Sequence, residues 1–286
     1  MRLSSAKRLE AQDLKKELGH YTRNEHFFEH LLERFGGEPG VGLLFVGGSN
    51  LRHLAVREAQ TYLRLDRTPS AWSHVAVVLH WPSRKEIDSD KRRSGLKVAK
   101  GVFGVEVALD PADPNGQLPE RNGVTFFCAE DYNDARSYPN LAYARLGLTE
   151  DQEKALHAVA LEPNRDRLRF PLWEWIAQWA GFVRDPATVP NPLRQGNAHP
   201  GSAFCEYLFE AAGVLIAPGL TAPNTAPEHL WSAVLYWHDR LQERPESEAP
   251  VELVTLVRDK AAQRSETRDP RDLAAEWARL TGSGEG

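Results

Sequence analysis

The segment SHVAVVLHW, residues 73–81, restricts the fold more than any other part of the chain. It is rich in β-branched valine, which favours an extended strand. The run VGLLFVGG at 41–48 is short, apolar and bounded by glycines, and it predicts a second buried strand. The segments GVFGVEVALD at 101–110 and NGVTFFCAEDY at 122–132 are two further strand candidates. The first half of the chain therefore predicts a compact antiparallel sheet.

Helical patterns surround these strands. Residues 4–36 and 50–65 place apolar side chains at three- and four-residue spacing, which indicates amphipathic helices. From about residue 140 the pattern turns helical, and we expect a helical insertion at about 140–183. A polar loop with four prolines follows at 184–202, and a helix is expected at 203–213. The expected fold class is α+β, with an antiparallel sheet packed against helices.

The same pattern divides the chain into three parts. Residues 1–40 are expected to form an N-terminal helical extension. Residues 41–240 are expected to form the main domain, which includes the helical insertion. Residues 241–286 are expected to be a charged C-terminal extension. With 286 residues, the chain is long enough to bury a large core.

Composition and charge exclude several classes of function. A net charge of −5 argues against a nucleic-acid partner, and no apolar run approaches the roughly 20 residues of a membrane-spanning helix. The N-terminus lacks the apolar region of a secretory signal, so we expect a cytoplasmic protein or export by a signal-peptide-independent route. Two cysteines are too few for a disulfide framework, which indicates free thiols in a reducing compartment.

The two cysteines occupy different settings. Cys205 follows the loop ending HPGS, so its thiol is expected in the first turn of a helix. The N–H groups and partial charge of a helix N-terminus lower a thiol pKa and can hold an oxyanion. The alternative is that Cys205 is a small buried apolar side chain. Cys128 lies between aromatic and acidic residues, a setting that raises a thiol pKa and indicates a structural role.

Two polar side chains stand within apolar strands. His74 is the second residue of the segment 73–81, and Glu106 lies in GVEVALD. On adjacent strands, the carboxylate could orient the imidazole, as in a Cys–His–acid triad. The alternatives are a half-buried histidine in a structural role and an acid that faces water while Val105 and Val107 face the core. His80 lies on the same side of its strand as His74, and a metal hydrolase using both is a further alternative, although no third ligand has a recognised spacing.

Taken in order, several segments resemble one family. They are GLLFVGGSN, SAWSHVAVVL, GVEVAL, NGVTFFCAEDY, AFCEYLFEAAGV and TAPEHLW. Together they resemble the circularly permuted papain-like cysteine hydrolases, the permuted relatives of NlpC-type peptidases. The resemblance implies that Cys205 is the nucleophile, His74 the general base and Glu106 the residue that orients the imidazole. The chain departs from the family pattern at Gly42, which no aspartate follows, and at Glu206, which replaces a serine and which we expect to point away from the thiol.

The resemblance implies a cysteine hydrolase that cleaves an amide (peptide or N-acyl) or ester bond without a metal or other cofactor. It implies peptide, peptidoglycan-fragment or acyl-amide substrates, and it fits a peptidoglycan amidase or endopeptidase, a cytoplasmic amidase or an effector-like toxin. The alternative is a catalytically silent binding or scaffold protein on the same fold. Its partner surface would be the helix at 171–183, which carries Trp173, Trp175 and Trp179. The interpretation that we favour for these rings is packing against the sheet.

Overall fold

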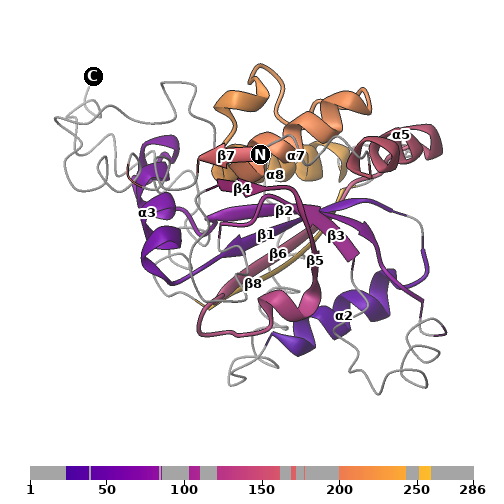
Figure 1. The fold of residues 1–286 in the computed structure, drawn as a ribbon, viewed down its shortest axis with the longest axis horizontal. Coiled ribbons are helices and arrows are strands. Elements are labelled where there is room, and N and C mark those ends of the chain that lie inside the picture. Colours follow the sequence, from indigo (N-terminus) through magenta and orange to yellow (C-terminus); the bar gives the residue numbers. More distant parts are fainter. Residues whose placement is uncertain are drawn as a thin grey trace, which may run out of the picture.

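Six strands form one antiparallel sheet, and helices cover both of its faces (Figure 1). In chain order the strands are β1 Gly42–Gly47, β2 His74–His80, β3 Phe103–Glu106, β5 Thr125–Cys128, β6 Asn140–Arg145 and β8 Glu252–Val257. Across the sheet their order is β5-β3-β2-β1-β6-β8, and every neighbouring pair is antiparallel. The computed structural model describes residues 24–38, 40–83, 85, 103–109, 121–161, 169–171, 177, 200–242 and 251–258. The expected α+β class with an antiparallel sheet is confirmed.

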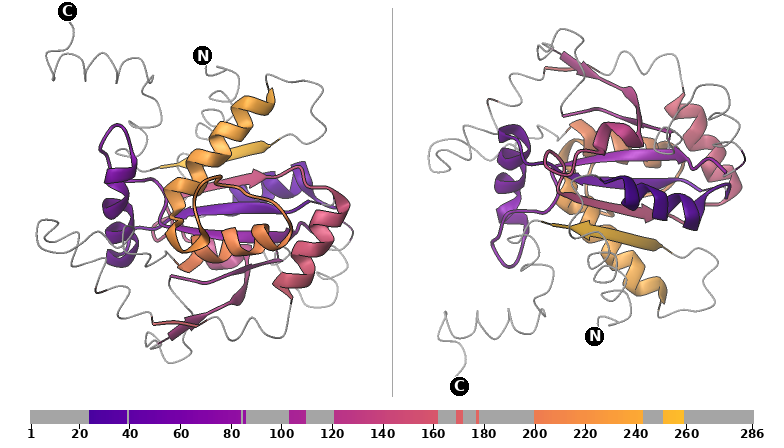
Figure 2. Two further views of the ribbon diagram at one scale, coloured as in Figure 1. Left: turned by 90° about the horizontal axis from the view of Figure 1, so that it is seen from above. Right: turned by 90° about the horizontal axis from the view of Figure 1, so that it is seen from below.

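The helices form two unequal layers. The helices on one face are α5 Glu150–Ala160, α7 Pro200–Ala211 and α8 Pro227–Gln242, and the opposite face carries α2 Glu25–Phe35. Figure 1 shows the strands between these layers, and Figure 2 shows α3 Leu51–Ala59 beyond one end of the sheet. The short helices are η1 Gln60–Leu63, η3 Ala129–Tyr132 and η6 Ala222–Asn224, and β4 Arg121–Gly123 pairs with β7 Arg169–Pro171 in a separate ribbon.

Strand β2 shows why the central strands have nearly continuous apolar sequences. Val75 and Val77 belong to the core beneath α7 and α8, whereas Ala76 and Val78 belong to the core beside α2. Successive side chains of a strand point to opposite faces, so a strand covered on both faces buries every position. The predictions of strands at 41–48 and 73–81 are confirmed by β1 and β2.

The predicted helical insertion begins too early. Asn140–Arg145 is β6, which lies between β1 and β8 in the sheet. Its sequence alternates, since Leu141 and Tyr143 join the core beside α2 while Ala142 and Ala144 join the opposite core. Hydrogen bonding to strands on both sides outweighs the helix propensity of leucine and alanine. A helix does follow at α5, but Trp173, Trp175 and Trp179 lie outside the described residues.

The segments predicted as extensions contribute to the main core. Helix α2, within 1–40, buries Phe27 and Phe28 against the sheet. Strand β8, within 241–286, pairs with β6 along its whole length. The described parts of both segments thus belong to one packed unit with the rest of the chain, while residues 1–23 and 259–286 lie outside the described residues.

Candidate active site

The position of His74 is set by the residue before it. The hydroxyl of Ser73 donates to the carbonyl of Val46 at 3.1 Å and accepts from the N–H of Gly48 at 3.0 Å. It also lies 2.6 Å from Nδ1 of His53, a buried side chain of α3. These bonds tie the start of β2 to the end of β1. His74 therefore stands on a rigid strand end rather than on a loop.

His74 and Glu106 form a buried pair. Nε2 of His74 lies 2.7 Å from Oε2 of Glu106, across the neighbouring strands β2 and β3. The two residues are 1% and 5% exposed, so the alternative in which Glu106 faces water does not hold. A carboxylate only accepts hydrogen bonds, so Nε2 carries the proton in this contact and Nδ1 is the basic nitrogen of the neutral ring. The expectation that the two side chains meet is confirmed; their catalytic roles stay predictions.

Tyr132, the last residue of η3, completes this group and was not singled out from the sequence. Its hydroxyl donates to Oε2 of Glu106, the same oxygen that His74 contacts. Burial, together with the charge of Glu106, holds the pKa of Tyr132 well above its usual range, so the phenol stays protonated. Tyr132 lies 26 residues from Glu106 and follows no periodic pattern with it, so no local signal connects the two.

The first turn of α7 meets the other edge of the imidazole. A Cβ atom added at Gly201 would lie 2.8 Å from both Nδ1 and Cε1 of His74, closer than real Cβ atoms approach. Glycine therefore allows the helix backbone to touch the ring at this point. The same added atom would lie 3.1 Å from the carbonyl oxygen of Val75. In the sequence this glycine lies within HPGS, where no local signal indicates a contact with His74.

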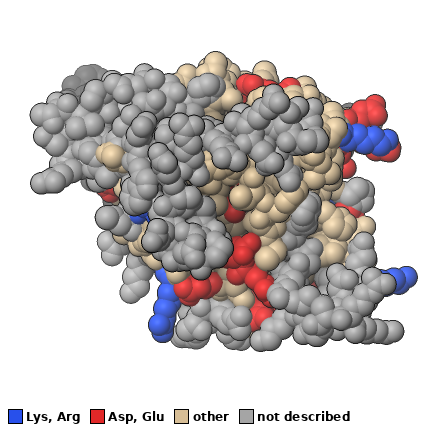
Figure 3. Space-filling view, viewed as in Figure 1, with Lys and Arg blue, Asp and Glu red and all other residues tan. Residues whose placement is uncertain are grey.

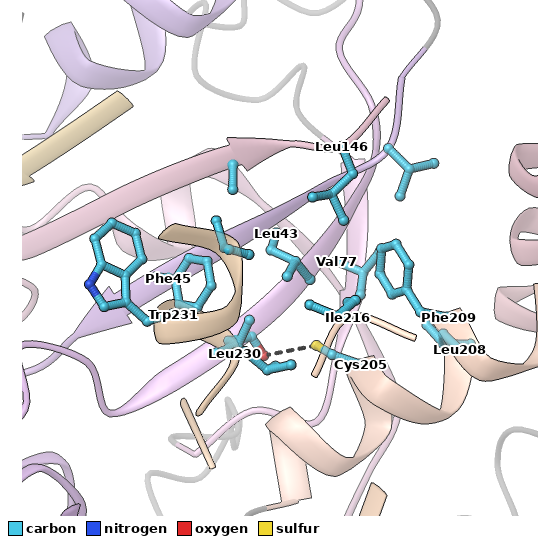
Figure 4. Close-up of a cluster of buried hydrophobic side chains, with 14 of the residues drawn as sticks. Leu43, Phe45, Val77, Leu146, Cys205, Leu208, Phe209, Ile216, Leu230 and Trp231 are labelled. Atoms are coloured by element: carbon cyan, nitrogen blue, oxygen red, sulfur yellow. Dashed lines mark hydrogen bonds between the residues drawn. The ribbon is translucent and has the colours of Figure 1, made fainter. Parts of the chain in front are cut away.

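Cys205 lies one turn further along the same helix face. Helix α7 begins at Pro200, not at residue 203, so the expectation that Cys205 lies in the first turn is wrong. Its thiol donates to the carbonyl of Val75 at 3.7 Å. Figure 4 shows the sulfur among buried apolar side chains that include Leu208 and Leu230. The imidazole of His74 and the thiol of Cys205 are thus placed around the same stretch of β2 backbone.

The surroundings of Cys205 favour the neutral thiol. Burial, and then the charges of Glu206 and Glu106, hold the pKa of the Cys205 thiol well above its usual range. The helix N-terminus has little opposing effect, since the macrodipole acts mainly within the first turn. The expectation of a thiolate stabilised by the helix start therefore does not hold.

Glu206 is buried, although it lies next to the thiol in the chain. Oε1 accepts from the N–H of Ala217 at 3.4 Å, whereas Oε2 has no partner among the described residues. Burial raises the pKa of the Glu206 carboxyl. The side chain is directed to the Ala217 peptide, but its charge still acts on Cys205.

The remaining sequence candidates lie apart from this group. His80 is exposed at the far end of β2, six residues from His74, or about 20 Å along a strand. Within the described residues, no three His, Cys, Asp or Glu side chains gather in a way that could hold a metal ion. Burial, and then the charge of Asp131, raise the pKa of Cys128, in agreement with the sequence prediction.

Charged side chains are unevenly distributed over the described surface. In the view of Figure 3, acidic side chains gather near the centre and the basic side chains of the described residues stand toward the edges. The described residues of this face form no basic patch. In the described part of the chain, no helix combines the length and the apolar character needed to cross a bilayer.

Comparison with known proteins adds no relative. No family model matches the chain, and no curated protein matches its sequence significantly. The functional interpretation therefore depends on the geometry around His74.

Proposed function

We propose that the protein is a cysteine hydrolase of permuted papain-like fold that cleaves an amide or ester bond. Cys205 is the nucleophile, His74 the general base and Glu106 the side chain that orients the imidazole. The observation that carries the proposal is the buried 2.7 Å contact between Nε2 of His74 and Oε2 of Glu106, beside the helix that bears Cys205.

The geometry of the pair supports this assignment. A buried imidazole and a buried carboxylate are costly to desolvate unless they compensate each other. Here Glu106 fixes the tautomer, so that Nδ1, the basic nitrogen, lies on the edge that faces the first turn of α7. The base, its orienting acid and a thiol of the adjacent helix are the parts that triad chemistry requires.

The reaction follows from these parts. The thiol proton of Cys205 passes to Nδ1 of His74 as the sulfur attacks the substrate carbonyl carbon. The tetrahedral intermediate collapses with breakage of the bond to nitrogen or oxygen, and the imidazolium donates its proton to the leaving group. Water, deprotonated by His74, then hydrolyses the thioester and returns the free thiol. Peptides, peptidoglycan fragments and acyl amides are the proposed substrates.

The reaction requires the Cys205 thiol to exchange its hydrogen bond to the Val75 carbonyl for one to Nδ1 of His74. In the free protein the Cys205 thiol donates to Val75 and has a raised pKa, so it is neutral. The sulfur must turn from that carbonyl toward Nδ1 of His74 before it can react. Proton transfer then accompanies attack, in place of a thiolate formed in advance. We expect the alkylation of Cys205 by iodoacetamide to be slow at neutral pH without substrate.

Acylation by p-nitrophenyl acetate tests the proposal. We expect one acetyl group on the peptide that contains Cys205, detected by mass spectrometry of the trapped protein. The variant Cys205→Ala should lose this label, and His74→Ala should acquire it roughly 10²–10⁴-fold more slowly. The matched control is Cys128→Ser, which removes the other thiol and should leave the rate unchanged. Acetylation of Cys205 at the same rate in His74→Ala and in the unaltered protein would overturn the assignment.

The second candidate is a catalytically silent scaffold on the same fold. The full burial of Cys205 among apolar side chains and its raised pKa favour this candidate. It predicts that neither p-nitrophenyl acetate nor N-acyl amides acylate Cys205 at any pH between 6 and 9. It also predicts that Cys205→Ala has an unchanged rate of hydrolysis for any substrate that the unaltered protein cleaves.

A further inference from the structure

We propose that Tyr132 is a positioning residue of this site, holding the carboxylate of Glu106 against His74 and sharing its negative charge. The inference rests on the proposed function and adds a fourth side chain to it. Tyr132 acts on the substrate only through Glu106 and His74.

The phenol is fixed in place by its surroundings. The ring of Tyr132 packs edge-on against Phe127 and Tyr138, with centroids 5.8 Å and 5.0 Å away. The backbone carbonyl of Tyr132 accepts from Nδ2 of Asn24 at 2.8 Å, which ties η3 to the start of α2. The ring lies 6.3 Å from that of His74, and the side chain is buried. Such a group has little freedom to turn its hydroxyl away from Glu106.

Two donors converge on one oxygen atom. Nε2 of His74 and the hydroxyl of Tyr132 both contact Oε2 of Glu106, so rotation of the carboxylate would break both contacts. The hydroxyl also withdraws charge from that oxygen, which moderates the attraction between Glu106 and a protonated imidazole. Hydrogen bonds to charged groups are among the stronger ones in proteins, especially where water is excluded.

Within the described chain, the other ionisable groups near the phenol lie on its own helix, on the loop after it and on β2. Asp131 and Tyr138 act electrostatically on Tyr132, in addition to Glu106. His74 faces the phenol from β2. Tyr138 lies in the same aromatic cluster and supplies a matched control, because its ring contacts Tyr132 while the hydrogen bond to Glu106 comes from Tyr132.

The variant Tyr132→Phe keeps the ring and removes only the hydroxyl. The first measurement is the low-field proton resonance of Nε2–H in His74, identified by its loss in His74→Ala. We expect this resonance to move further downfield in Tyr132→Phe, because the carboxylate charge concentrates on the contact with the imidazole. It should stay in place in Tyr138→Phe. This measurement needs no substrate, so it tests the inference even if hydrolase activity is not found.

The second measurement is the pH profile of Cys205 acetylation. We expect the acid limb of the profile to move to higher pH by roughly one unit in Tyr132→Phe, with a roughly tenfold lower maximum rate. A purely structural role predicts a lower melting temperature with an unchanged resonance and an unchanged profile, and that result would overturn the inference. Failure of Cys205 acetylation in the unaltered protein, with the resonance shift present, would instead overturn the proposed function alone.

Discussion

At the scale of single residues, the site brings together a buried histidine–carboxylate pair and a buried neutral thiol. Nε2 of His74 and Oε2 of Glu106 lie 2.7 Å apart, and this contact offsets the cost of burying both side chains. Cys205 has no such compensation, because its neighbours are apolar or acidic and raise its pKa. In the proposed mechanism, the buried dyad accepts the proton of a thiol that stays neutral until a substrate binds.

Glu206 allows a prediction on stability and pH. Its pKa is raised by burial, so the folded protein binds this proton more tightly than the unfolded chain does. The stabilisation from this group is complete below the unfolded pKa of about 4.3 and is lost as pH rises through the folded pKa. Relative to the unaltered protein, Glu206→Gln should therefore gain unfolding free energy as pH rises from about 5 to 8.

Urea denaturation at several pH values measures this difference. Replacing one buried oxygen by an amide group also changes the free energy of unfolding, but by the same amount at every pH. The change of the stability difference with pH therefore reports the titration of Glu206 alone. The control is Glu58→Gln, on the exposed face of α3, which should show a much smaller pH dependence of its stability difference. A difference for Glu206→Gln that stays constant across this range contradicts the prediction.

At the scale of elements, an ion-pair network joins α8 to the segment after α3. Nη1 of Arg64 donates to Glu228 at 2.7 Å, and its other guanidinium nitrogens contact Asp66 at 3.1–3.2 Å. Ser70 donates to the second oxygen of Glu228 at 2.6 Å. Burial raises the pKa of Glu228 despite the guanidinium beside it. Because the Glu228 carboxylate is buried, the free-energy cost of burying its charge depends on these partners.

Removal of Arg64 should therefore be costly. We expect Arg64→Met to lower the free energy of unfolding by about 3 kcal/mol, since it leaves Glu228 buried without its cation. In the double variant with Glu228→Gln, part of this loss should be recovered, because the uncompensated charge is gone. A double-mutant cycle by urea denaturation measures the coupling, and simple additivity of the two substitutions would contradict it.

At the scale of the whole molecule, the sheet separates two cores. Phe209 of α7 lies in the core on one face and Phe35 of α2 in the core on the other, and both are almost fully buried. Side chains on opposite faces of a sheet do not share a cavity. A change in one core should therefore leave the packing of the other core intact.

Paired substitutions test this independence. Phe35→Leu and Phe209→Leu should each lower the free energy of unfolding by about 1–2 kcal/mol, and their effects should add within about 0.5 kcal/mol. Phe45 and Trp231, whose rings lie 5.1 Å apart in one core, are the matched control. Substitution of both by leucine should show a coupling of about 0.5–1.5 kcal/mol. Strong coupling between Phe35 and Phe209 contradicts the two-core arrangement.

Much of the sheet was predictable from the sequence. Valine-rich and glycine-bounded runs are typical of buried strands, and they located β1 and β2. The segment 140–145 was not predictable in this way, because NLAYAR has residues that suit a helix as well as a strand. The segment is a strand because it pairs with β1 on one side and with β8 on the other, and both partners are distant in the chain.

The sequence by itself determined the chemical types at the site: a histidine at a strand start, an acid within a strand and a cysteine near a helix start. Only the tertiary structure decided which of them meet. It joined Glu106 to His74, added Tyr132 to the same carboxylate oxygen and began α7 three residues earlier, which places Cys205 beyond the first turn. The physical reason is that burial and hydrogen-bond partners depend on packing between distant segments, which local patterns do not contain.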